Sequence, residues 1–355
     1  MMRVASFFVR RLAAALFTLL ALIAVTFVVY WALPSTPAQF VYPEAQHLTA
    51  YQLAHANHLL GLDRPKGMQY LDYLWQLAHG DVGRFWTGSV LVENTKLQQQ
   101  PIGPQLFPSL RATLSIILGG AALVVLLAVP LGAFAGTRVG SNSDRAISSV
   151  SLVGVCTHPM VLGLILATTF GYSHLRWLPG GGYCPLVRTS TSPCGGVVDW
   201  ADHLVLPWIT FALLFLALYT RMIRASVAET LPEDFVRTAR AKGASELHVV
   251  TRHVLPSASL RVLTMVGMEI GTAIGVCIYI EAAFGIEGLG TLAVRAMGGA
   301  TSDIDLPYTL AIVTMITLIV VIGNLVVDLL YAVLDPRASA IDDRRATKGA
   351  LGGVL

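Results

Sequence analysis

Six apolar segments follow one another along the chain, separated by polar stretches. Most are long enough to supply the roughly 20 residues that an α-helix needs to cross a bilayer. The segments cover about Leu12–Leu33, Ala112–Thr137, Ala146–Tyr172, Leu204–Tyr219, Val262–Phe284 and Tyr308–Val333. The third and fourth contain Pro159 and Pro207, which membrane helices tolerate. The pattern predicts an all-α integral membrane protein with six spans.

The polar stretches define the expected organisation of the chain. We expect four regions: an N-terminus with the first span at 1–33, an extracytoplasmic insert at 34–109, a five-span core at 110–337 and a loose tail at 338–355. Within the insert, apolar positions recur at helical spacing and predict a short amphipathic helix. Those positions are Tyr70, Tyr73, Leu74 and Leu77.

Composition supports a membrane location. The chain is 55% hydrophobic and 13% charged, whereas soluble domains carry about 25% charged residues. A net charge of +3 is too small to indicate a polyanionic partner, and no basic, aromatic-rich patch points to nucleic acid.

The distribution of basic residues predicts the orientation. With six spans and the N-terminus inside, about 16 of the 24 Lys and Arg residues fall on the cytoplasmic side. This asymmetry follows the positive-inside rule and places both termini and the 230–256 loop in the cytoplasm. A cleaved signal peptide is the alternative for the first segment, but its apolar core exceeds an h-region of about 7–15 residues.

The 230–256 stretch is the longest strongly charged segment. Thr230 and Glu233 fit a capping box, with Pro232 in a first helical turn. Gly243 then suits a left-handed helix stop and Ser245 a second N-cap, and we expect Pro256 to close the unit. The pattern predicts a basic helix-turn-helix between two spans.

This stretch resembles the cytoplasmic coupling loop of binding-protein-dependent ABC importers, in the form used by the peptide and nickel permease branch. Gly243 is followed by nine residues and then by His253, Val254, Leu255 and Pro256. Arg237, Thr238 and Ala239 stand where the general pattern has Glu-Ala-Ala, and His253 stands where it has Ile. The resemblance implies ATPase coupling through Glu233, Asp234, Phe235, Arg237, Thr238, Ala239, Arg240, Lys242, Gly243, His253, Leu255 and Pro256.

Other blocks resemble the same family in the right order. They are Leu60–Pro65, Gly80–Arg84, Leu178–Tyr183, Glu281–Gly290, Asp303–Pro307 and Asn324–Arg337. The resemblance implies a six-helix type I ABC importer permease in the prokaryotic plasma membrane, with its insert between helices 1 and 2. It also implies a second homologous permease, two ATPase subunits and an extracytoplasmic solute-binding protein as partners. ATP and Mg are then expected on the ATPases, with no cofactor on this chain.

Enzymatic motifs are absent from the sequence. It contains no Walker A motif, no Gly-x-Ser-x-Gly elbow and no His-Glu-x-x-His motif. Glu269, Glu281 and Asp328 fall within spans, where ionisable groups suggest function. These carboxylates either line a cation or proton path or have a structural role in helix packing or partner contact. If they line a path, the alternative function is that of an ion-coupled secondary transporter. Such a transporter usually shows an internal repeat, and none is evident here.

Three further sets of residues are candidates for structural roles. Cys184 and Cys194 share an extracytoplasmic loop, where a disulfide persists; two free thiols are the alternative. Gly267, Gly271 and Gly275 line one face of the fifth span and predict close packing, within the chain or against a partner permease. His55 and His58 lack a third ligand, so no metal site is expected.

Overall fold

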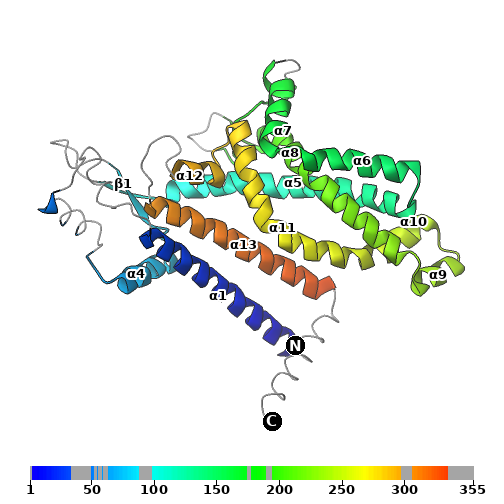
Figure 1. Ribbon diagram of the computed structural model, residues 1–355, viewed down its shortest axis with the longest axis horizontal. Coiled ribbons are helices and arrows are strands. Elements are labelled where there is room, and N and C mark those ends of the chain that lie inside the picture. The colour runs from blue at the N-terminus through cyan, green and yellow to red at the C-terminus, as the bar shows by residue number, and fades with distance from the viewer. Residues whose placement is uncertain are drawn as a thin grey trace, which may run out of the picture. The chain divides into compact units, whose positions relative to one another are not determined.

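The computed structural model describes residues 2–32, 49–51, 54, 58, 63–87, 98–173, 177–188, 194–296 and 306–334. The long helices are α1 (Met2–Ala32), α5 (Gly103–Thr137), α8 (Val197–Thr230), α11 (Leu255–Phe284) and α13 (Leu306–Leu334) (Figure 1). The shorter helices are α4 (Lys66–Ala78), α6 (Asn142–Cys156), α7 (Pro159–Leu166), α9 (Asp234–Ala241), α10 (Glu246–Val249) and α12 (Leu289–Ala296). Two π-helical turns, η1 (Ala167–Ser173) and η2 (Val250–Val254), follow α7 and α10.

Five helices of the described ranges are long and apolar enough to cross a membrane. They are Val9–Val29, Gly103–Thr137, Val197–Thr230, Arg261–Phe284 and Tyr308–Leu330. Their outward surfaces are strongly apolar: Phe17 and Val28 of α1 are exposed in the isolated chain. A surface of this kind requires a hydrocarbon environment, as the segment pattern predicts.

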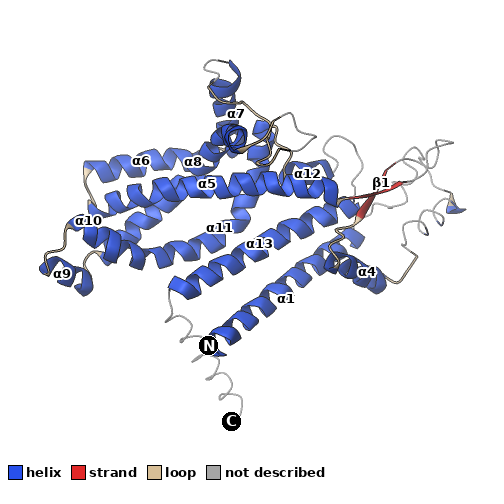
Figure 2. Cartoon of the chain, turned by 180° about the vertical axis from the view of Figure 1, so that it is seen from behind, coloured by secondary structure: helices blue, strands red, loops and turns tan. Residues whose placement is uncertain are grey.

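The third predicted span differs from the expectation of one continuous helix. The helical segment breaks at Thr157 and His158, between α6 and α7. His158 caps α7, because its Nδ1 accepts a hydrogen bond from the Met160 amide at 3.3 Å, and Pro159 occupies the first helical turn. A proline suits that turn but not a helix interior. Figures 1 and 2 accordingly show α7 turning away from the direction of α6.

The helices that contain the second, fourth and fifth predicted spans are longer than the predicted spans. Pro207 does not break the fourth, since α8 runs through it from Val197 to Thr230. The second also starts early, because α5 begins at Gly103 and contains Pro108 within its first turns. Pro256 likewise lies in the first turn of α11 instead of closing the unit before it.

The described chain divides into two compact units. The first comprises Met1–Ala13, Ala112–Ile286 and Ile322–Leu355, and the second comprises Ala14–Arg111 and Glu287–Val321. In the first unit, α8 packs against α6, α7 and α11. Its core includes Ile116, Leu204, Phe211, Ile280 and Phe284.

Close packing in the first unit depends on glycines of α5. A Cβ on Gly120 would lie 2.6 Å from the Phe211 ring, and a Cβ on Gly136 would lie 2.8 Å from the Arg224 carbonyl oxygen. Gly119 and Gly132 meet α8 side chains in the same way. These contacts let α5 and α8 approach more closely than larger residues would permit.

The second unit has its own core. It is formed by Val82, Ile102, Leu106, Leu289, Leu292, Ala296, Tyr308, Ala311, Ile312 and Met315. The predicted amphipathic helix is confirmed as α4. A short hairpin departs from the all-α expectation: β1 (Arg84–Thr87) pairs antiparallel with β2 (Gln98–Pro101), with Arg84 opposite Pro101.

Candidate functional site

The 230–256 segment folds as two short helices around a glycine stop. Gly243 has φ +83°, and its amide donates to the Arg240 carbonyl at 2.9 Å. The next amide, of Ala244, donates to the Ala239 carbonyl at 3.2 Å. These two bonds form a Schellman motif, which satisfies the last carbonyls of α9. Ser245 then caps α10, since its Oγ accepts from the His248 amide at 3.4 Å. The predicted helix stop at Gly243 and the predicted N-cap at Ser245 are therefore confirmed.

The predicted capping box at the start of the unit is wrong. Thr230 is the last residue of α8, and its hydroxyl donates to the Ser226 carbonyl at 2.8 Å, one turn back in the same helix. Glu233 occupies the N-cap of α9 without a side-chain capping bond. A buried threonine finds its partner within α8, so its hydroxyl is not available to cap the next helix.

The 230–256 segment is anchored by its apolar residues in the core of the first compact unit. Val236 and Ala239 of α9 and Val249 and Val254 beyond the stop are buried there. A guanidinium–carboxylate pair joins the two helices on the outside, with Arg240 Nε donating to Glu246 Oε1 at 2.7 Å. Exposed pairs of this kind contribute little stability. The buried residues are therefore what fixes the unit to α8 and α11.

Other residues of the 230–256 segment are exposed and mixed in character. Phe235 is 41% exposed and Leu247 is 76% exposed. The basic side chains Arg237, Arg240 and Lys242 of the same segment are also exposed. An exposed aromatic and an exposed aliphatic residue amid positive charge are suited to contact with another protein.

A half-buried ion pair lies close to the start of this unit. Asp144, at the beginning of α6, accepts two hydrogen bonds from Arg224 of α8, one of them 2.6 Å from Nη2 to Oδ2. The same carboxylate accepts from the Gly140 amide at 2.9 Å. The Arg224 guanidinium, with help from this amide, lowers the pKa of Asp144 to about 2. The pair fixes the 138–144 turn to α8 six residues before its end. The sequence alone does not reveal this pair, because the partners are 80 residues apart.

The three candidate carboxylates within spans have different surroundings. Glu281 is fully buried near the end of α11, and the Thr113 hydroxyl donates to its Oε1 at 2.6 Å. Asp328 of α13 forms an ion pair with Arg11 of α1 at 2.8 Å. Glu269 is partly buried on α11 and lies within electrostatic range of Tyr219 on α8. Glu281 and Asp328 are thus held in pairs that join separate helices of the first unit.

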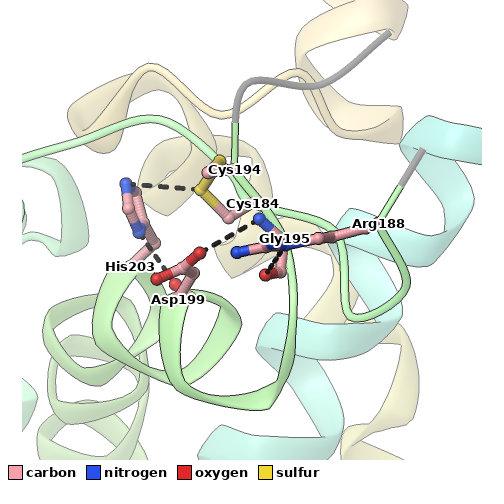
Figure 3. The surroundings of a disulfide bond; sticks show 6 residues. All are labelled: Cys184, Arg188, Cys194, Gly195, Asp199 and His203. Carbon is pink, nitrogen blue, oxygen red and sulfur yellow. Dashed lines mark hydrogen bonds between the residues drawn. A yellow bond between two sulfur atoms is a disulfide. The ribbon is translucent and has the colours of Figure 1, made fainter. Parts of the chain in front are cut away.

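The loop that precedes α8 contains a disulfide between Cys184 and Cys194, whose Cα atoms lie 5.6 Å apart (Figure 3). Cys184 is buried, and its Sγ lies 3.6 Å from His203 Nε2. The first turns of α8 hold the second half of the loop: the Gly195 amide donates to Asp199 Oδ2 at 3.1 Å, and Arg188 Nε donates to the Gly195 carbonyl at 3.0 Å. The disulfide therefore closes a loop that is also hydrogen-bonded to the helix.

The three glycines of the fifth span are only partly explained by packing within the chain. A Cβ on Gly267 would lie 3.3 Å from Val327 of α13, whereas Gly271 and Gly275 have no neighbouring atom within 4 Å of that position. The close helix approach instead uses the α5 glycines. Gly271 and Gly275 remain candidates for contact with another subunit.

Metal ligands do not gather in the described part of the chain, which contains no group of three His, Cys, Asp or Glu side chains suited to a metal. His55 lies outside the described residues. His58 pairs with Asp63 at 3.0 Å, and this hydrogen bond holds the pKa of the Asp63 carboxyl below its usual value.

Family comparisons agree with this architecture. The family described as binding-protein-dependent transport system inner membrane component matches residues 128–340, and its N-terminal region matches residues 1–87. The first match alone covers more than half of the chain. The chain belongs to this family and is a multi-pass permease subunit of an ABC importer, in which a separate subunit is the ATPase.

Individual relatives cover nearly the whole chain. A Brucella ovis protein described as a peptide permease is 32% identical over 92% of this chain and 97% of its own length. The di/tripeptide transport system permease protein DppB of Pseudomonas aeruginosa is 32% identical over 94% of this chain and 98% of its own length.

A solved structure supports the fold assignment. One chain of the MetNI methionine ABC transporter was solved in an inward-facing conformation. Its whole length matches 67% of the present chain, with a TM-score of 0.52 and 15% identity. The shared fold is that of a type I importer permease. The expected fold class is therefore confirmed, and the ion-coupled alternative is not favoured.

Proposed function

We propose that this chain is the permease subunit of an importer for peptides or peptide-sized ligands. The observation that carries the proposal is the 230–256 unit, a capped helix pair anchored in the core with an exposed face of apolar and basic residues. The substrate class comes from the relatives, which are described as peptide and di/tripeptide permeases.

The proposed assembly places this chain in the lipid bilayer together with three other kinds of subunit. A second, homologous permease completes the substrate path, two ATPase subunits bind ATP and Mg, and a solute-binding protein delivers the ligand from outside. The basic residues favour an orientation with both termini and the 230–256 unit in the cytoplasm. In that orientation the Cys184–Cys194 loop faces the oxidising side, where its bond persists.

Coupling follows from how the unit is attached. Val236, Ala239, Val249 and Val254 are packed in the same core as α8 and α11. A displacement of the unit therefore moves the ends of both helices, since cores do not deform continuously. The Asp144–Arg224 pair adds the start of α6 to the same block. Such movement changes access to the path only if the ATPase binds the two conformations with different affinity.

Two exposed side chains test the proposed ATPase contact. Burial of one large aliphatic side chain contributes about 2 kcal/mol, or roughly 30-fold in affinity. We expect Leu247→Asp and Phe235→Asp each to reduce recovery of the ATPase by a tagged permease complex by at least that factor. The matched control is Val187→Asp, because Val187 is 73% exposed and lies in the loop before α8.

The outcomes separate the hypotheses. Loss of ATPase with both 230–256 variants and retention with the Val187 control support the contact. Full recovery with Leu247→Asp and Phe235→Asp would show that the ATPase binds elsewhere on the chain.

A further inference from the structure

Helix α4 carries three distinct faces, although an amphipathic helix needs only two. At about 100° per residue, one face contacts the rest of its compact unit and includes Tyr70, Tyr73, Leu74 and Leu77. A second face is polar and includes Gln69, Asp72 and Gln76. The third face is apolar and exposed: Met68 is 56%, Leu71 63% and Trp75 69% exposed.

The first face attaches α4 to two membrane-spanning helices. The Tyr70 hydroxyl donates to the Leu20 carbonyl of α1 at 3.2 Å, and its ring lies 5.4 Å from that of Phe27. The Tyr73 hydroxyl shares a 2.9 Å hydrogen bond with Thr314 of α13. Figures 1 and 2 both show α4 beside the C-terminal part of α1.

These contacts fix the depth of α4. Leu20 lies nine residues inside the span that ends at Val29, and Thr314 lies six residues inside the span that starts at Tyr308. At 1.5 Å per residue the tyrosine tips reach about 13 Å and about 9 Å below the ends of these spans. Half of the hydrocarbon core measures about 15 Å. Both tips therefore lie inside the apolar layer, with the Tyr70 tip close to its midplane, and the helix that carries them lies in the outer part of that layer.

We propose that α4 is an interfacial helix whose Met68, Leu71 and Trp75 face is covered by lipid. The leaflet is the one at the C-terminal end of α1, which is the outer leaflet in the orientation proposed above. Interfacial helices insert an apolar face about 5–10 Å into the boundary between headgroups and acyl chains, and tryptophan favours that depth.

The polar face is suited to the headgroup side of this arrangement. Asp72 on this face forms an ion pair with Arg64 at 3.1 Å, which offsets its charge. The Trp75 ring contacts His79 with centroids 4.3 Å apart, which places a polar ring beside the indole at the end of the helix. Lipid is therefore the occupant that fits both the depth and the chemistry; a docked solute-binding protein is the competing occupant.

Spin labelling distinguishes the two. A nitroxide is attached to Leu71→Cys and, as the matched control, to Gln76→Cys, about 140° away on the same helix. The assembled importer is placed in nanodiscs without nucleotide, and collisions with oxygen and with a water-soluble nickel chelate are measured. The unmodified chain reports any labelling of its own cysteines. Because no transport is measured, the result does not depend on the substrate.

The proposal predicts a higher oxygen-to-nickel collision ratio at Leu71 than at Gln76, unchanged when the binding protein is added. Two results would overturn it. One is equal nickel access at both positions, which would place the face in water. The other is nickel access at Leu71 that disappears on addition of the binding protein, which would make that protein the occupant.

Discussion

Substitution of Gly243 tests the geometry on which coupling depends. Gly243 adopts φ +83° and has open space where a Cβ would lie, so a side chain would cause backbone strain without a steric clash. An L-residue in this conformation costs about 1–2 kcal/mol, which Asn largely avoids and β-branched residues exceed. We expect the population of the intact motif to fall progressively more from Gly243→Asn through Gly243→Ala to Gly243→Val. The most affected variant should lose roughly 5- to 30-fold.

The chain provides a matched control for this strain. Gly80 ends α4 with φ +80°, open space at Cβ and the same pair of bonds, from Gly80 to the Leu77 carbonyl at 3.0 Å and from Asp81 to the Gln76 carbonyl at 3.0 Å. Gly80→Val should therefore cause similar local strain while leaving the ATPase contact untouched.

The assay is recovery of the ATPase by the tagged permease complex, alongside substrate-stimulated ATP hydrolysis in nanodiscs. We expect both to decline through the Gly243 series and to remain at the wild-type level in Gly80→Val. Wild-type recovery with Gly243→Val, or an equal loss with Gly80→Val, would refute the reasoning.

Three further predictions follow from other contacts. Asp144→Asn should lower the melting temperature by removing the charge that pairs with Arg224. Since the folded pKa of Asp144 is depressed to about 2, the pair's contribution to stability is full above about pH 4 and is lost as the pH falls through 2. A wild-type melting temperature that declined from pH 8 to pH 6 because of this carboxyl group would contradict the prediction. A membrane-impermeant maleimide should label Cys184 and Cys194 from outside only after reduction, and labelling of unreduced protein would argue against the bond. Gly120→Ala should destabilise the permease by about 1–3 kcal/mol through its contact with α8, whereas Gly275→Ala should leave its melting temperature unchanged, and equal melting temperatures would argue against the helix approach.

Local signals in the sequence predicted much of this structure. Gly243 and Ser245 fix the turn between α9 and α10 through backbone conformation and a single side-chain cap, both of which depend on neighbouring residues only. The tyrosine spacing predicted α4 in the same way. Such features are readable because their physical cause lies within one or two helical turns.

Other features depend on distant partners and were not predictable. Asp144 meets Arg224, and Thr113 meets Glu281, only after the helices have packed. Thr230 was misassigned for a related reason, since a threonine hydroxyl bonds equally well to a carbonyl one turn earlier in its own helix.

Uptake into proteoliposomes is the most direct test of the importer assignment. The complete complex is reconstituted with ATP at the cytoplasmic face, binding protein at the other and labelled di- and tripeptides, with and without an ionophore that dissipates ion gradients. We predict uptake that requires ATP and the binding protein, persists with the ionophore and is strongly reduced by Gly243→Val. Uptake by this chain alone, driven by an ion gradient and abolished by Glu269→Gln, would contradict it.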